Sequence, residues 1–195
     1  MRYTLGTTQI AALRLETLDS FFNPFSQQFI QQHLTAPITS ALDLGCGPGF
    51  TTAMVAEAAG CPNVCGLDSS ARFLKAAVSR VQQCRFLKHD VSRTPFPVRA
   101  DLIYGRFLLT HLKHQAALVN QWVRQLNHTG ILLMEETDDI ETGIAVFKKY
   151  VQVTKGMIAA QGGCLYAGRL LKDTRYEAEV VYNQPVRIPV PNCIC

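Results

Sequence analysis

The residues with the clearest chemical potential lie in the segment 41–50, ALDLGCGPGF. An apolar run delivers an acidic residue into a glycine-dense turn, whose members are Asp43, Gly45, Cys46, Gly47 and Gly49. Glycine lacks Cβ and tolerates positive φ, so such a turn can end a strand, bring its N–H groups against a ligand and start a helix at once. The segment therefore predicts a nucleotide-like ligand at a strand end.

Two common glycine-rich motifs do not fit this spacing. A dinucleotide-binding fingerprint needs glycine at its sixth position, which is Phe50 here, and a P-loop ends in Gly-Lys-Ser or Gly-Lys-Thr. The pattern Asp-x-Gly-x-Gly-x-Gly instead resembles the first motif of the class I S-adenosylmethionine-dependent methyltransferases. This resemblance implies that the turn, Cys46 included, contacts the cofactor and that Asp43 lies near the amino acid end of that cofactor.

A regular order of helices and strands must position such a turn. Apolar spacing and the pair Asn23-Pro24 predict two N-terminal helices, over 8–22 and 25–34. The chain then alternates between the two kinds of element: strands over 39–44, 64–67, 85–88, 101–105 and 131–135, and helices over 51–59, 71–81 and 115–126, the first of these helices ending at Gly60. The order predicts an α/β fold, a doubly wound, Rossmann-like and mostly parallel sheet with helices on both faces, which binds ligands at the carboxyl ends of its strands.

Acidic residues follow the second and third predicted strands. Asp68 lies close to the twenty-residue spacing at which a carboxylate receives the two ribose hydroxyls in nucleotide folds. Asp68, Ser69 and Ser70 could also cap the next helix, and the two roles are compatible. Asp90 and Val91 resemble the pair that contacts adenine in the family, where the carboxylate accepts from the exocyclic amine and the Val N–H donates to a ring nitrogen. A simple loop start is the alternative for Asp90.

The resemblance extends to residues outside these motifs. The segment 101–112 is similar to the motif under the methionyl part of the cofactor, which puts Arg106 beside the cofactor unless it makes an ordinary ion pair. Tyr3 and Arg14 are similar to residues of an N-terminal cap that closes over the cofactor. His111 is the candidate general base because imidazole titrates near neutrality, although a histidine at this place more often fixes the loop by hydrogen bonds. Methyl transfer is an in-line displacement that strictly requires no catalytic side chain.

Composition limits the classes of function. A chain of 195 residues, 48% hydrophobic, predicts one domain: a helical cap over 1–38, a cofactor-binding core over 39–136, and an acceptor-side helix with an incomplete C-terminal part over 137–195. The sequence carries no secretory pattern, so a cytoplasmic protein with reduced cysteines is expected. The net charge of +4 is scattered, which disfavours a nucleic-acid partner, and no cysteine pair has the second half of a zinc pattern, so no metal site is expected.

The C-terminal part departs from the family. A helix over 140–160 is expected to shape the acceptor pocket, and 179–182 is the candidate sixth strand. The family usually adds a seventh, antiparallel strand, but a proline-broken tail follows here, so a shortened domain with an unfilled and association-prone sheet edge is expected. An acidic run could face the acceptor or cap a helix: Glu135, Glu136, Asp138 and Asp139. The predicted function is methyl transfer from S-adenosylmethionine to a small molecule; the alternatives are a cofactor-binding protein with little turnover and a nicotinamide-dependent oxidoreductase.

Overall fold

The computed structural model describes residues 9–172 and 174–190, with side chains from residue 13 onward. Tyr3 lies outside the described residues. The strands are β1 (Ser40–Leu44), β2 (Asn63–Asp68), β3 (Arg85–Lys88), β4 (Ala100–Arg106) and β5 (Leu126–Glu135). The helices are α1 (Gln9–His33), α2 (Phe50–Ala59), α3 (Ala71–Arg80), the short 3₁₀ helix η1 (Leu109–His111), α4 (Gln115–Val123), α5 (Ala145–Ala160) and α6 (Ala167–Lys172).

The described strands form one parallel sheet in the order β3-β2-β1-β4-β5. The central strand β1 is paired on both sides, so that Leu44 lies opposite Leu67 on one neighbour and opposite Gly105 on the other. The order of the strands reverses at β1, which makes the gap between the carboxyl ends of β1 and β4 the point where such sheets bind ligands. The predicted α/β, doubly wound, parallel fold is confirmed.

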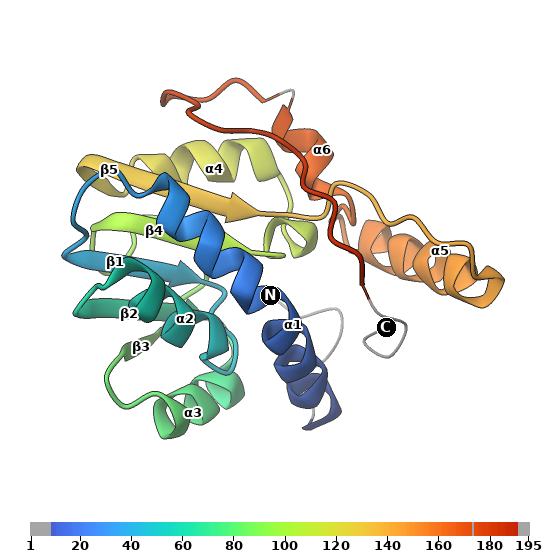
Figure 1. The fold of residues 1–195 in the computed structure, drawn as a ribbon, viewed down its shortest axis with the longest axis horizontal. Coiled ribbons are helices and arrows are strands. Elements are labelled where there is room, and N and C mark those ends of the chain that lie inside the picture. Colours follow the sequence, from blue (N-terminus) through green and yellow to red (C-terminus); the bar gives the residue numbers. More distant parts are fainter. Residues whose placement is uncertain (1–8, 173, 191–195) are drawn as a thin grey trace.

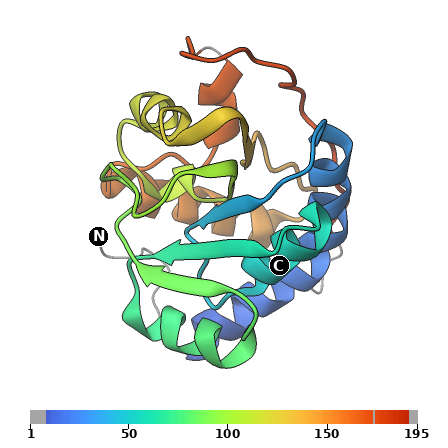
Figure 2. The same cartoon turned by 90° about the vertical axis from the view of Figure 1, so that its left-hand side faces the viewer.

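Helices cover both faces of the sheet (Figures 1 and 2). Alternate residues of β1 point to opposite faces, because successive side chains of a strand do so. Leu42 and Leu44 belong to the core beneath α4, whose Trp122 is fully buried there. Ala41 faces the other core, in which Ile30 of α1 packs with side chains of α2. Burial on both faces explains why the strands read as continuous apolar runs.

The N-terminal region differs from the expected pair of helices. Residues 9–33 form the single helix α1, with Pro24 inside it. A proline removes one backbone hydrogen bond but not the side-chain packing around it. Here the residues after Pro24 carry Ile30 into the core, and this tertiary contact outweighs the local break that the sequence indicates.

The C-terminal region also differs from expectation. The segment 179–182 forms no strand, and Tyr182 instead packs its ring against those of Phe29 and His33 on α1, with centroids 6.0 and 4.6 Å away. The helix expected over 140–160 begins only at Ala145, and β5 begins at Leu126 rather than at residue 131. The chain from residue 173 to 190 holds no strand among its described residues, so β5 gains no second partner there.

The helix α5 projects away from the sheet (Figure 1). Only Val151 and Ile158 of this helix are buried. A second apolar row with 4-3-4 spacing is exposed: Val146, Tyr150, Val153 and Met157. None of the helices in the described ranges combines the length and the apolar character that crossing a membrane requires.

Candidate functional site

The glycine turn between β1 and α2 has the positive-φ backbone that its composition predicts. Gly45, Gly47 and Gly49 have φ values of 70°, 51° and 91°, which side-chain-bearing residues rarely adopt. The turn is tied to β2, because the N–H groups of Gly45 and Cys46 both donate to the carbonyl of Leu67, at 2.8 and 3.1 Å. A Cβ on Gly49 would lie 3.0 Å from the Cβ of Ala77, so α3 also leaves no room for a side chain there.

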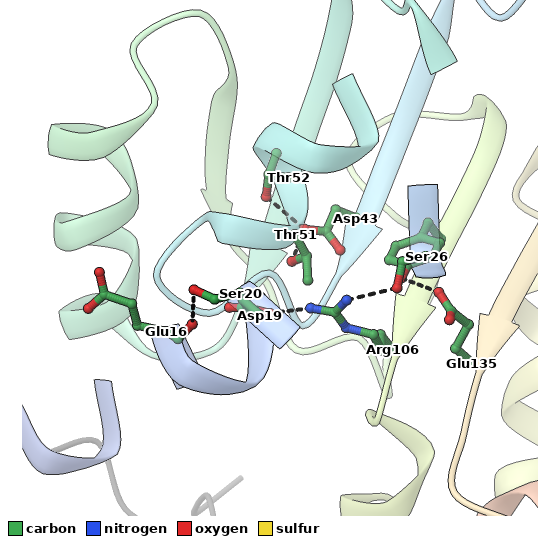
Figure 3. A network of polar contacts seen from close by, with 10 residues as sticks. Glu16, Asp19, Ser20, Ser26, Asp43, Thr51, Thr52, Arg106 and Glu135 are labelled. Atoms are coloured by element: carbon green, nitrogen blue, oxygen red, sulfur yellow. Dashed lines mark hydrogen bonds and ion pairs between the residues drawn. The ribbon is translucent and has the colours of Figure 1, made fainter. Parts of the chain in front are cut away.

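Asp43 lies beneath this turn and is almost fully buried. Its Oδ2 accepts hydrogen bonds from the hydroxyls of Thr51 and Thr52, each at 2.7 Å (Figure 3). Burial raises the pKa of Asp43 to about 7, although the two threonine hydrogen bonds oppose the rise. The carboxyl group thus joins the last residues of β1 to the first turn of α2 and fixes the glycine turn from below.

Arg80 holds the same turn from the side of α3. Its guanidinium donates to the carbonyl of Pro48 at 2.8 Å and lies 4.0 Å from the ring centroid of Phe50. An arginine stacked on an aromatic ring combines a cation–π contact with directed hydrogen bonds. Phe50 occupies the position where a dinucleotide-binding fingerprint needs glycine. Its ring instead packs against the guanidinium of Arg80.

Asp68, at the end of β2, lies beside the glycine turn as the spacing predicts. Its Oδ2 accepts the N–H of Gly47 at 2.9 Å, and its Oδ1 accepts the N–H of Ser70 at 2.7 Å. Burial raises the pKa of Asp68, and the backbone hydrogen bonds counteract the rise. Ser70 rather than Ser69 caps α3, through a 3.3 Å bond from the N–H of Phe73 to its hydroxyl. Asp68 is half-buried, and the backbone N–H of Ser69 also approaches its carboxylate, which can accept up to about four hydrogen bonds in all.

Asp90 and Val91 follow β3, which is joined to β2 by the hydrogen bond from the His89 N–H to the carbonyl of Asp68 at 3.0 Å. Asp90 accepts the N–H and hydroxyl of Ser92 at 3.0 and 2.6 Å, which is the geometry of a residue that starts a loop. Val91 buries its side chain in the core, and its carbonyl accepts the indole N–H of Trp122 at 2.8 Å. The pair is thus held rigidly next to Asp68.

Arg106, at the end of β4, forms a buried ion pair with α1 (Figure 3). Its side chain is 3% exposed, pairs with Asp19 and donates to the hydroxyl of Ser26 at 2.8 Å. Burial raises the pKa of Asp19 to about 6, and the charge of Arg106 limits the rise. Arg106 thus makes the ion pair that the sequence indicates as the alternative to a place beside the cofactor. This pair connects the carboxyl end of β4 with the N-terminal helix.

The amino-terminal half of α1 lies along the carboxyl edge of the sheet (Figure 1). Besides Asp19, this half brings Phe22 to within 5.0 Å of Phe107, measured between ring centroids. A Cβ on Gly47 would lie 3.8 Å from Leu15. The amino-terminal half of α1 thus lies beside the glycine turn and the turn after β4.

His111 ends η1 and is half-buried. Burial and the positive charge of Arg14 lower the pKa of His111 to about 4. The imidazole is therefore neutral at physiological pH, and Arg14 of α1 acts on it electrostatically. Among the described residues, no group of three or more His, Cys, Asp or Glu side chains could hold a metal ion.

Sequence reasoning missed several residues that build the site. Thr51 and Thr52 lie eight and nine residues after Asp43, and a strand–turn–helix geometry could have placed them near it. Asp19 is 87 residues from Arg106, and nothing in the local sequence indicates their pairing. The acidic run of residues 135–139 predicts Glu136 as an acceptor-facing residue or a helix cap, whereas its carboxylate accepts the N–H groups of the turn after β4.

Residues 41–130 match the family model of a methyltransferase domain. The chain is 33% identical over 153 residues to trans-aconitate 2-methyltransferase of Methylobacterium radiotolerans, an alignment that covers 78% of this chain and 58% of that protein. The same enzyme of an Enterobacter species is 29% identical, with 61% of this chain and 47% of the relative covered. The chain therefore spans about half the length of these curated relatives.

Solved structures of methyltransferases share the overall fold. DesVI of Streptomyces venezuelae superposes with a TM-score of 0.57 at 17% identity, covering 70% of this chain and 62% of DesVI. An amino pentose methyltransferase from Micromonospora echinaspora, solved with bound S-adenosylmethionine, gives a TM-score of 0.56 at 19% identity, with 70% and 61% covered. At these identities the likeness concerns the fold alone.

Proposed function

Because this chain belongs to the class I S-adenosylmethionine-dependent methyltransferases, we propose that it binds S-adenosylmethionine at the carboxyl ends of β1, β2 and β3 and transfers the methyl group to a small molecule. The observation that carries the proposal is the hydrogen bond from the Gly47 N–H to Asp68. It places a carboxylate acceptor directly beside a glycine backbone that has no side chains to exclude a ligand.

The residues present fit an adenosyl cofactor. Gly45 is exposed in the turn, which leaves its backbone open to a ligand. Asp68 and Asp90 follow neighbouring strands, β2 and β3, and both are half-buried carboxylates. In the proposed assignment Asp68 receives the ribose hydroxyls with Ser69 beside it, while Asp90 and the Val91 backbone face adenine.

The amino acid end of the cofactor belongs near β1 and β4 in this assignment. Asp43 shapes that end indirectly, because its carboxyl group is occupied by Thr51 and Thr52. Arg106 likewise acts by holding α1 in place through Asp19 and Ser26. Cys46 contributes through its backbone, since its thiol is buried and burial raises its pKa.

The bound cofactor would supply an activated methyl group, and the protein would orient the acceptor and exclude water. His111 is the proposed proton acceptor, if the methyl acceptor loses a proton. With its pKa lowered to about 4, the imidazole is in the form that can take a proton at neutral pH, but it is a weak base. Replacing His111 should therefore reduce turnover by far less than the 10²–10⁴-fold typical of a strong general base.

The acceptor is proposed to be a small molecule, in keeping with the relatives, whose names specify trans-aconitate. We also propose a cytoplasmic location. Five described cysteines carry free thiols, as a reducing compartment allows: Cys46, Cys61, Cys65, Cys84 and Cys164.

Calorimetric titration with S-adenosylhomocysteine and with NADPH tests the cofactor. Binding of S-adenosylhomocysteine without binding of NADPH supports the proposal, and the reverse result would establish a nicotinamide enzyme. A second assay supplies cofactor with a radiolabelled methyl group and a panel of metabolites that includes trans-aconitate. Tight binding without label transfer to any acceptor would favour the alternative of a cofactor-binding protein without turnover.

A further inference from the structure

Glu136, directly after β5, reaches across to the turn that follows β4. Its Oε1 accepts the backbone N–H groups of Leu108 at 2.8 Å and Leu109 at 2.6 Å, and its Oε2 accepts the hydroxyl of Thr110 at 3.3 Å. Backbone N–H groups at the start of a helix have no acceptor within that helix. Glu136 therefore satisfies the first N–H groups of η1 from a different part of the chain.

The backbone is hydrogen-bonded at both residues that flank Glu136. On the side of β5, the Phe107 N–H donates to the carbonyl of Glu135 at 2.8 Å. On the other side of Glu136, the carbonyl of Thr137 accepts the N–H of Gly168 at 2.9 Å. Glu136 thus extends from a fixed backbone, and its carboxylate can hold the turn rather than follow it.

The turn held by Glu136 supports the glycine turn after β1. A Cβ on Gly45 would lie only 2.8 Å from the Cδ1 atom of Leu108, so the leucine side chain fills the space beside this glycine. The residue before Leu108, Phe107, has a φ of 51°, which a side-chain-bearing residue rarely adopts. A turn with such a backbone persists only where its surroundings fix it, and Glu136 supplies the fixing hydrogen bonds.

We propose that Glu136 is a positioning residue for the cofactor: by holding residues 108–110 it keeps Leu108 against Gly45 and so sets the backbone that meets the ligand. This inference rests on the proposed function, because it takes the glycine turn to be the cofactor-binding element. The role requires acceptor oxygens at this position rather than a negative charge. Burial of the carboxyl group raises the pKa of Glu136 to about 7, which agrees with a group whose charge is unfavourable there.

Three variants and two measurements test the proposal. Glu136→Ala removes the acceptors, Glu136→Gln retains an oxygen that can accept both N–H groups, and Glu177→Ala removes an exposed carboxylate that pairs with Arg124. Amide hydrogen exchange of Leu108 and Leu109 is measured without ligand, and S-adenosylhomocysteine affinity is measured by calorimetry. We expect Glu136→Ala to lose protection at both amides and to bind the ligand on the order of tenfold more weakly. We expect Glu136→Gln to restore both properties, and Glu177→Ala to change neither.

Leu108→Ala tests the second half of the argument even if Glu136→Ala does not fold. This variant should weaken the affinity while its amide protection persists, because the hydrogen bonds to Glu136 involve only the backbone. Unchanged affinity in folded Glu136→Ala, or in Leu108→Ala, would overturn the positioning role. If the wild-type protein binds no S-adenosylhomocysteine, the proposed function fails instead, and the exchange data still decide whether Glu136 holds the turn.

Discussion

The carboxylate of Asp68 accepts the backbone N–H of Gly47 at 2.9 Å, so the end of β2 holds the glycine turn that follows β1. The sequence predicts the two motifs separately, one by its glycines and the other by its spacing. Their hydrogen bond shows that they act as one unit, and a change at Asp68 must therefore alter the turn as well as any hydroxyl contact.

We expect Asp68→Ala to weaken S-adenosylhomocysteine binding by about 1–3 kcal/mol, because the N–H groups of Gly47 and Ser70 lose a charged acceptor. Ser70→Ala is the matched control, since it removes only the cap bond to Phe73. The control should cost about 1 kcal/mol of unfolding free energy with little change in affinity. Calorimetry and urea denaturation measure the two quantities. Equal affinities for wild type and Asp68→Ala would reject the ribose assignment.

Alanine should be far less tolerated at Gly49 than at Gly47. Both glycines have positive φ, for which a side chain costs roughly 1–2 kcal/mol. At Gly49 the new Cβ would also lie 3.0 Å from the Cβ of Ala77, and such overpacking adds about 1–3 kcal/mol. At Gly47 the nearest side chain is Leu15, at 3.8 Å. Urea denaturation of the two variants checks the order, which equal stabilities would contradict.

Breaking the ion pair between Arg106 and Asp19 should be costly. We expect Arg106→Met to lose about 3–5 kcal/mol of unfolding free energy at pH 8, because it leaves Asp19 charged and buried. The loss should be smaller at pH 5, where Asp19, with its pKa raised to about 6 even beside Arg106, takes up a proton. The double variant Arg106→Met/Asp19→Leu should recover part of the stability at pH 8. A loss independent of pH would mean that packing, not charge, explains the effect.

Glu136 predicts a pH dependence of stability with a definite sign. Its pKa rises from 4.5 to about 7 on folding, so the native state binds more protons than the unfolded state between these values. The stability contributed by Glu136 is complete below pH 4.5 and is lost as the pH rises through 7. Glutamine does not titrate, so Glu136→Gln should gain up to about 3 kcal/mol over wild type between pH 5 and pH 8.

Chemical denaturation across this pH range checks the prediction for Glu136. Glu177→Gln is the control, because pairing with Arg124 lowers the pKa of Glu177 and places its effect below this window. The control curve should run parallel to that of the wild type, whereas the Glu136→Gln curve should diverge from it. Parallel curves for all three proteins would contradict the raised pKa.

The parts of the fold that sequence could predict depend on local chemistry. The strand before Gly45 is predictable because a buried parallel strand is a continuous apolar run. The end of α2 is predictable because Gly60, with φ 56°, adopts a conformation that glycine favours. The placement of Asp68 follows from the regular spacing of strand and helix. Each of these features is determined by residues close together in the chain.

The remaining features depend on contacts between distant residues. Local sequence indicates a break at Pro24, but the burial of Ile30 keeps α1 continuous across it. Residues 179–182 have the apolar character of a strand, yet Tyr182 finds its partners on α1. The link from Glu136 to the turn at Leu108 likewise joins two elements that only the folded sheet brings together.

The proline inside α1 has a mechanical consequence for this molecule. Pro24 has no N–H to donate to the carbonyl of Ser20. One backbone hydrogen bond is therefore missing between the half of the helix that carries Asp19 and the half that carries Ile30. A helix bends most readily at such a point. The amino-terminal half therefore depends for its position over the glycine turn on side-chain contacts, chiefly the ion pair of Asp19 with Arg106 and the packing of Phe22 on Phe107, whereas the carboxyl-terminal half is anchored in the core by Ile30.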